Sequence, residues 1–272
     1  MRIKTVMLVL MVLLGACQPA EESLKFVVIP AEDAFLTRRQ WGPVADYLSE
    51  GLGQKVELLM ASDYTAVVEA MKYKHADIAR FGPASYVMAV DEGADIEPIV
   101  MALKAETGLP GYYALLIAQV DTDISDLTKL TLGLVDVGST SGGVLPSMYF
   151  DKMGIEPKHT LYAGSHGAVI LAVQNGTVDV GATNSTRLSV ALQQGVYKEG
   201  EFQIIWKSEM IPNSPIVVQS TMAQKTKDKL VELFYNIPED IMLETATDEI
   251  GYVKADDATY DPVREIVHYK DQ

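Results

Sequence analysis

A run of small and hydroxyl-bearing residues at positions 136–143, DVGSTSGG, has the composition of an anion-binding turn. It follows an expected strand at 131–135 and opens an expected helix. The first turn of a helix leaves about four backbone N–H groups unpaired, at the positive end of the helix dipole. Ser139, Thr140 and Ser141 would add hydroxyl donors there, and the glycines would let an anion approach the backbone closely. The alternative is an ordinary N-cap by Ser139 or Thr140, and the local sequence does not separate the two.

Four further residues occupy positions where strands end or helices begin. His166 lies in the segment AGSHG between an expected strand and helix, so its ring could point at the same anion. Tyr64 opens a helix, Tyr112 lies on an expected hinge strand, and Arg80 ends a strand. Each has a plainer explanation, because a lone histidine usually caps or packs, aromatic residues fill cores, and a strand-end arginine can be solvated. The four residues are therefore candidates for the wall of a shared cleft.

The sequence lacks the motifs of several kinds of active site. No Gly-Lys-Ser/Thr follows the glycine-rich turn, so it is not a nucleotide-binding P-loop. Thr140 occupies the centre of the GSTSG run, so it is not a serine nucleophile elbow. The remaining histidines, at positions 75, 159 and 268, lack metal-ligand spacing, and no paired carboxylates occur in a plausible loop. The sequence therefore predicts a binding protein without metal or cofactor, and not a secreted hydrolase.

The first 17 residues carry the pattern of an export signal. Arg2 and Lys4 are followed by an unbroken apolar run that is too short to span a bilayer comfortably. Leu-Gly-Ala-Cys17 comes next and resembles the lipobox of bacterial lipoproteins, in which the cysteine is acylated. Cys17 is the only cysteine, so it has no disulfide partner within the chain. We expect a signal peptide at 1–16, a polar tether at 17–23 and a lipid-anchored location in the periplasm or at the cell surface; an ordinary signal peptide is the alternative.

The charge balance excludes a nucleic-acid binder. The full chain has a formal net charge of −15, and without residues 1–16 it keeps 20 basic and 37 acidic side chains, a net charge of −17. Affinity for nucleic acid comes mainly from basic groups on phosphates, and anionic lipid surfaces repel an acidic chain. Any anion that the protein binds must therefore be held by local donors, because the overall field opposes it.

Strands and helices alternate along the mature chain at short intervals, which predicts an α/β fold of parallel βαβ units. Breaks at 108–111 (GLPG) and 211–215 (IPNSP) make the middle third look like an α/β unit inserted into another. We expect one lobe at 24–107 plus 216–272 and a second at 112–210, hinged by two crossing strands with a ligand cleft between them. Expected strands are 24–29, 56–60, 77–81, 96–103, 112–120, 131–135, 161–163, 178–182, 202–207 and 216–219. Expected helices are 38–52, 64–72, 84–91, 124–130, 144–153, 167–174, 188–194, 226–235 and 261–268.

These segments, in this order, resemble the periplasmic substrate-binding proteins of phosphonate, phosphite and phosphate ABC importers over almost all of the mature chain. The STSG box with a later Gly-x-His is fairly specific for that family, whereas the other matching pieces are individually common. The resemblance implies a two-lobe, class II periplasmic binding protein that closes over its ligand and delivers it to a membrane permease and an ATPase. The matching segments are ASDY (61–64), DIARFG (77–82), PGY (110–112), STSG (139–142), AGSH (163–166), VDV (178–180), IPNSP (211–215) and YDPVR (260–264).

The same resemblance implies roles for particular residues. Family members that bind 2-aminoethylphosphonate place two carboxylates against the ligand ammonium, and the matching positions here are Thr186 and Ser214. Both acids are absent. An unpaired buried ammonium is costly, so an anion without an amine fits better: phosphite, methylphosphonate or phosphate. The residues that match the holders of the phosphonate oxygens are Ser139, Thr140, Ser141 and His166, and those that match two cleft tyrosines are Tyr64 and Tyr112.

Arg80 is a second departure, because the family usually has an aromatic residue at this position. If Arg80 faces the cleft, it favours a more highly charged anion such as phosphate. We therefore expect a monomeric, lipid-anchored substrate-binding component of an ABC importer. A ligand-sensing partner of a membrane signalling kinase, for the same class of anion, fits the sequence equally well.

Overall fold

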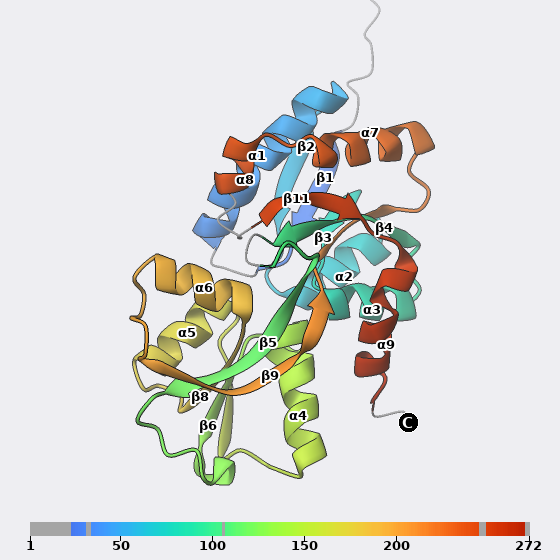
Figure 1. Cartoon of the computed structure of the whole chain (residues 1–272). Helices are drawn as coiled ribbons and strands as arrows, with labels where there is room; N and C mark the ends of the chain where they lie inside the picture. The colour runs from blue at the N-terminus through green and yellow to red at the C-terminus, as the bar shows by residue number, and fades with distance from the viewer. Residues whose placement is uncertain (1–22, 31–33, 105–106, 245–248, 270–272) are drawn as a thin grey trace, which may run out of the picture.

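The computed structural model describes residues 23–30, 34–104, 107–244 and 249–269 of the 272-residue chain. The expected signal peptide, Cys17 and all but the last residue of the expected tether lie outside the described residues. The described part forms two α/β lobes, one above the other in Figure 1, and each lobe has its own sheet. None of the described helices combines the length and the apolar composition that a bilayer crossing requires.

The first lobe contains a six-stranded sheet with helices on both faces. Its strands, in sheet order, are β11 (Glu249–Lys254), β4 (Ile96–Lys104), β10 (Pro215–Gln219), β3 (Ile78–Arg80), β1 (Leu24–Val28) and β2 (Val56–Met60). One face is covered by α1 (Ala34–Leu52), α7 (Gln224–Tyr235) and α8 (Glu239–Glu244), and the other by α2 (Tyr64–Lys72), α3 (Pro83–Asp91) and α9 (Asp261–Val267). Successive strand residues point to opposite faces, so Phe26 and Val28 pack under α1 and Val27 packs under α2.

The second lobe contains a five-stranded sheet. Its strands, in sheet order, are β7 (His159–Tyr162), β6 (Thr131–Leu134), β8 (Val180–Asn184), β5 (Gly111–Gln119) and β9 (Phe202–Pro212). One face is covered by α4 (Leu145–Met153), and the other by α5 (His166–Gln174) and α6 (Ser185–Gln193). Leu115 and Ile117 of β5 pack against α5 and α6, whereas Leu116 and Ala118 pack toward α4. The same two-residue period therefore builds a core on each side of this sheet.

The predicted α/β fold is confirmed, but the sheets are mixed and not purely parallel. β1 is parallel to β2 and β3, and β6 is parallel to β7 and β8. β10 and β11 run antiparallel to their neighbours, and β5 runs antiparallel to β8 and β9. The passage of the chain between the lobes explains the difference for β5 and β10. Each strand enters its sheet directly from the other lobe, without the crossover helix that a parallel neighbour needs.

Several elements differ from those expected. The helix expected at 124–130 is only a short 3₁₀ turn at Leu127–Lys129, and β9 continues to Pro212, through part of the expected break. Neither α8 nor β11 has a counterpart among the expected elements. β11 is hard to recognise because Gly251 interrupts its short apolar pattern, and because it pairs with β4 in an irregular register at the edge of the sheet.

Asn213 lies where the two crossings between the lobes meet. Its backbone N–H donates to the Pro110 carbonyl at 2.8 Å, and its side-chain amide donates to the Ala102 carbonyl at 2.9 Å. The Tyr260 hydroxyl donates to the Asn213 carbonyl at 2.9 Å. A buried asparagine therefore ties both crossings to the core of the first lobe.

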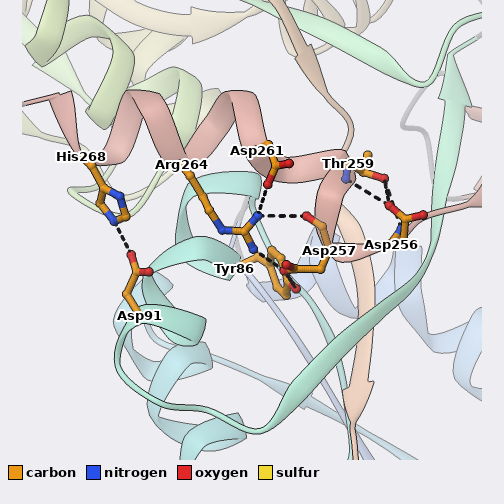
Figure 2. Close-up of polar contacts among 8 residues, drawn as sticks. All are labelled: Tyr86, Asp91, Asp256, Asp257, Thr259, Asp261, Arg264 and His268. Carbon is orange, nitrogen blue, oxygen red and sulfur yellow. Dashed lines mark hydrogen bonds and ion pairs between the residues drawn. The ribbon is translucent and has the colours of Figure 1, made fainter.

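The C-terminal helix α9 is fastened to the first lobe by charged contacts, which Figure 2 shows. Arg264 donates to the carboxylate of Asp257, and the Tyr86 hydroxyl of α3 donates to the same carboxylate at 2.6 Å. Just beyond α9, the Tyr269 hydroxyl donates to Asp151 of α4 in the second lobe. The C-terminal segment therefore contacts both lobes.

Candidate functional site

A small cavity of about 40 Å³ lies between the lobes. A cavity of this volume holds a group the size of a few water molecules. Every residue that the sequence analysis places in the cleft lines it: Tyr64, Arg80, Tyr112, Ser139, Thr140, Ser141, His166, Thr186 and Ser214. The other lining residues are Ile29, Gly82, Lys104, Asn184, Arg187 and Asn213.

Helix N-termini from both lobes converge on this cavity. Tyr64 is the first residue of α2, and Gly82 precedes α3 in the first lobe. His166 is the first residue of α5, and Thr186 lies in the first turn of α6 in the second lobe. Each helix start presents backbone N–H groups and the positive end of a dipole. The convergence favours an anion at the centre.

The DVGSTSGG segment forms a π-helical turn at Thr140–Val144 before α4 begins. Ser139 caps this turn, because its Oγ accepts a hydrogen bond from the Gly142 N–H at 3.1 Å. A Cβ atom on Gly143 would lie 2.0 Å from the carbonyl oxygen of Asp136, so only glycine fits there without a shift. The Ser139 hydroxyl therefore caps the turn, as one of the two alternatives expects, and Ser139, Thr140 and Ser141 all line the cavity.

The two lobes touch across the cavity. The N–H of Ala84, in the first turn of α3, donates to Thr140 Oγ1 at 2.8 Å. Because Thr140 accepts this bond, its hydroxyl keeps its own proton to donate. Tyr64 and Tyr112 are buried, and burial raises the pKa of each phenol, that of Tyr112 to about 12. Both phenols are therefore protonated at neutral pH and can donate a hydrogen bond to an anion.

His166 is buried, and its ring contacts two residues of β8. Asn184 Oδ1 accepts a hydrogen bond from the Arg187 N–H at 2.9 Å, so Asn184 Nδ2 is the atom that faces His166 Nε2, at 3.2 Å. This network assigns Nε2 as the acceptor and places the ring proton on Nδ1, 3.4 Å from Thr183 Oγ1. Burial, with the nearby positive charge of Arg187, lowers the pKa of His166 to about 3. The ring is therefore neutral at neutral pH and adds no charge to the cavity.

Arg80 and Lys104 bring positive charge to the cavity from the ends of β3 and β4. Both contact Oε1 of the buried Glu249, at 3.5 Å from Arg80 Nη2 and 3.1 Å from Lys104 Nζ. The Arg80 guanidinium also lies over the Trp41 ring, 5.0 Å from its centroid. Burial lowers the pKa of Lys104, while the charge of Glu249 opposes that shift. Arg80 is thus 7% exposed and paired, and not a solvated strand end.

The sequence patterns used above do not predict that Lys104 and Arg187 line the cleft, although each has a local feature that could have placed it there. Lys104 directly follows the strand expected at 96–103, just before the expected hinge. Arg80 was chosen as a candidate because it also lies at the end of an expected strand. Arg187 directly follows Thr186. Glu249 lies on β11, which no local pattern predicts, so its pairing with the two cations becomes visible only in the folded chain.

Among the described residues, no carboxylate side chain lines the cavity. Thr186 and Ser214 do line it, at the positions where the resemblance would place acids in a binder of an aminophosphonate. The part of the chain that the structure describes also contains no group of three side chains suited to a metal ion. The described lining offers hydroxyls, backbone N–H groups and cations, which together can hold an anion.

Comparison with known proteins gives the family. A family model described as ABC transporter, phosphonate, periplasmic substrate-binding protein matches residues 26–260. The chain is 32% identical to the phosphonates-binding periplasmic protein of Escherichia coli K12, over 92% of this chain and 78% of the relative. It is 31% identical to the phosphate-import protein PhnD of Mycolicibacterium smegmatis, over 90% of this chain and 85% of the relative. A solved binding protein component of an ABC phosphonate transporter from Pseudomonas aeruginosa has a TM-score of 0.82 at 29% identity, over 92% of this chain and 86% of that chain.

The family match covers strands of both lobes and every residue that lines the cavity. Proteins of this family bind substrates for a transporter and are not enzymes. The expected two-lobe fold of a periplasmic binding protein is confirmed by the solved relative. The chain therefore belongs to the periplasmic substrate-binding proteins of phosphonate ABC transporters.

Proposed function

We propose that this protein is a lipid-anchored, monomeric receptor that captures a small phosphorus oxyanion without an amine, namely phosphite, methylphosphonate or phosphate, for the permease and ATPase of an ABC importer. The family supports the transport role. The choice of ligand depends on the residues that line the cavity. Thr186 and Ser214 lie at the two positions where a ligand with an amine would need carboxylate partners.

Charge and size both support a small, amine-free anion. The ammonium group of 2-aminoethylphosphonate would enter a cavity lined by Arg80, Lys104 and Arg187, with no carboxylate among the described lining residues. An ammonium that is desolvated beside like charges and left unpaired is strongly disfavoured. The cavity volume of about 40 Å³ also leaves little room for an aminoalkyl chain.

We assign the oxygen contacts to donors that line the cavity from both lobes. Ser139 supports the turn that presents Thr140 and Ser141, and His166 can offer the Nδ1 proton, whose contact with Thr183 is long at 3.4 Å. A charge-assisted hydrogen bond to an oxyanion is stronger than one between neutral groups, so these donors gain by turning to the ligand. The proposed ligand-binding residues are Ser139, Thr140, Ser141, His166, Tyr64, Tyr112 and Arg80, and the proposed specificity positions are Thr186 and Ser214.

The names of the relatives agree with this class of ligand. The Escherichia coli relative is named for phosphonates, and the Mycolicibacterium smegmatis relative is named for phosphate import. Their identities to this chain are nearly equal, at 32% and 31%, so similarity alone does not choose between the two ligands. The cavity lining is therefore the argument for an amine-free anion.

Calorimetric titration of the chain that begins after Cys17 tests the proposal. The ligands are phosphite, methylphosphonate, phosphate and 2-aminoethylphosphonate. We expect tight binding of at least one amine-free anion. We expect 2-aminoethylphosphonate to bind at least about 100-fold more weakly, a difference in binding free energy that corresponds to the loss of roughly two hydrogen bonds to a charged group. Tight binding of 2-aminoethylphosphonate would overturn the roles proposed for Thr186 and Ser214.

A matched pair of serine variants tests whether the ligand binds in this cavity. Ser141→Ala removes a proposed oxygen contact and should weaken binding by about 10-fold or more. Ser147→Ala removes a hydroxyl from α4, outside the residues that line the cavity, and should leave the affinity unchanged. Equal affinities for the two variants would place the ligand elsewhere.

For the anchor, Cys17→Ser should release the exported protein from the membrane fraction, and its retention there would contradict lipidation.

A further inference from the structure

Asn184 ends β8 and lines the cavity beside His166, and it is buried, with 7% of its surface exposed. Its side-chain oxygen Oδ1 accepts a hydrogen bond from the Arg187 N–H at 2.9 Å and thereby caps α6. Asparagine, aspartate and serine all suit this capping position. In the described part of the chain, Asp63 caps α2 and Ser165 caps α5 in the same way. Capping alone therefore does not explain why position 184 carries an amide.

The amide nitrogen of Asn184 is the part of the side chain that the cap does not use. Nδ2 carries two hydrogens, and one of them is directed to His166 Nε2, at an N–N distance of 3.2 Å. Among the described residues, no other acceptor lies within hydrogen-bonding distance of Nδ2. A buried donor without an acceptor is costly. Because Asn184 lines the cavity, an oxygen of the bound anion is the acceptor available to its second hydrogen.

The same nitrogen decides where the ring proton of His166 lies. Nδ2 of Asn184 can only donate, so the ring nitrogen that faces it must be the unprotonated one. In a neutral ring the proton then lies on Nδ1, whose contact with Thr183 Oγ1 is long at 3.4 Å. The opposite tautomer would bring two N–H groups face to face and would leave Nδ1 without a proton to offer. Asn184 therefore keeps Nδ1 of His166 a donor.

We infer that Asn184 is a further ligand-binding residue, which donates its second amide hydrogen to the oxyanion and holds His166 in the tautomer that donates from Nδ1. Toward the anion Asn184 is a direct contact, and toward His166 it is a positioning residue. The inference rests on the proposed function, because it concerns the same cavity and a phosphorus oxyanion as ligand.

Asn184→Asp tests the tautomer, because it replaces the donor by an acceptor and keeps the cap. Aspartate caps a helix as well as asparagine does, so the variant should fold. Its second carboxylate oxygen faces Nε2 of His166, which should then carry a proton. Nitrogen-15 NMR of the ring, at mildly alkaline pH without ligand, distinguishes the two forms, and the signals of His166 are identified by their absence in His166→Gln.

We expect the ring of His166 to carry its proton on Nδ1 in the wild-type chain that begins after Cys17, and to carry a proton on Nε2 in Asn184→Asp. A ring protonated on Nε2 in the wild type, or the same tautomer in both proteins, would overturn the inference. A purely structural role of Asn184 as a helix cap would not move the proton, since both residues cap α6 equally well.

Calorimetric titration with phosphate and methylphosphonate tests the direct contact. Asn184→Ser keeps a cap but removes the amide donor, and it should weaken binding by about 10-fold. Asn184→Asp sets a carboxylate oxygen beside the anion and should weaken binding by at least about 100-fold. Asn175→Asp makes the same charge change at the exposed end of α5, outside the cavity lining, and should bind normally. Unchanged affinity in Asn184→Ser, or equal losses in the two Asn184 variants, would contradict the contact.

The outcomes separate this inference from the proposed function. The NMR measurement needs no ligand, so it tests the tautomer whether or not an oxyanion binds. If no phosphorus oxyanion binds to the folded wild-type chain, the proposed function fails and the contact with Asn184 fails with it. If methylphosphonate or phosphate binds tightly and binds equally well to Asn184→Ser, the proposed function stands and only the role of Asn184 is wrong.

Discussion

The imidazole of His166 is 3% exposed and lies near Arg187, and both conditions disfavour a second ring proton. In the unfolded chain the same ring binds that proton near the ordinary pKa of 6.5, whereas in the folded chain the pKa is about 3. Between these values the unfolded state binds more protons than the folded state. The contribution of His166 to stability is therefore complete above the unfolded pKa and is lost progressively as the pH falls through this window.

We predict that His166→Gln flattens the dependence of stability on pH. A difference of one bound proton changes the free energy of unfolding by about 1.4 kcal/mol per pH unit. Below the ordinary histidine pKa, wild type should lose stability on acidification more steeply than the variant, by up to that amount per unit. Urea unfolding in phosphate-free buffer over a series of mildly acidic pH values measures the slope.

His75→Gln is the control for this experiment, because His75 is exposed to solvent. Its slope should match that of wild type, because this substitution leaves the buried ring of His166 in place. If wild type and His166→Gln had the same slope, the buried ring would titrate normally, and its assignment as a neutral donor would be wrong.

Among the elements, the turn before α4 is set by close backbone packing. The Val135 N–H donates to the Gly142 carbonyl at 2.7 Å, and this bond folds the turn back on the end of β6. A side chain at Gly142 or Gly143 would collide with Val135 and with the Asp136 carbonyl, respectively. The π-helical form of the turn therefore depends on two adjacent glycines, and the cavity-facing hydroxyls depend on the turn.

Gly143→Ala should distort this turn. We expect a loss of about 1–3 kcal/mol in the free energy of unfolding, as for other overpacked sites, together with weaker binding of the oxyanion. Gly42→Ala in α1 is the matched control, because no atom beyond its two chain neighbours and the backbone of its own helix lies within 4 Å of the added Cβ. Because Pro43 follows and restricts a side chain at position 42, we expect no gain in stability from this variant, but normal binding. Normal stability and binding in Gly143→Ala would contradict the packing argument; urea unfolding and calorimetry measure both.

In the whole molecule, the lobes contact one another at the cavity and at the C-terminus. Inside the cleft, Ala84 donates to Thr140, and outside it the Tyr269 hydroxyl donates to Asp151 of α4. Asn213 joins the two crossings to each other and to the first lobe. A motion that separates the lobes must break the contact in the cleft and change the one at the C-terminus, so both bear on how fast a ligand can leave.

We predict that Tyr269→Phe speeds ligand release. The lost contact lies at the surface and is worth about 0.2–1 kcal/mol, which corresponds to a rate increase of up to about fivefold. Stopped-flow tryptophan fluorescence, with excess competing ligand, measures the dissociation rate. Tyr235→Phe on the exposed side of α7 is the matched control and should dissociate at the wild-type rate. A rate in Tyr269→Phe that equals the control would show that the C-terminal contact does not restrain the lobes.

Much of the site is encoded in short segments of the sequence. Ser139, His166 and Tyr64 could be placed at helix starts because caps, glycines and apolar periods act over a few residues. The resemblance also located Thr186 and Ser214, and the structure places both at the cavity. The antiparallel strands could not be foreseen in the same way, because β5 and β10 take their direction from a crossing between lobes and not from their own residues.

Local signals are sufficient to predict from the sequence which side chains stand where strands end and helices begin. The charge of the cavity, by contrast, is established only when the chain folds. The neutrality of His166 depends on burial, and Glu249 joins Arg80 and Lys104 only after folding. Burial and ion pairing depend on distances between positions far apart in the chain, which no short segment of the sequence contains.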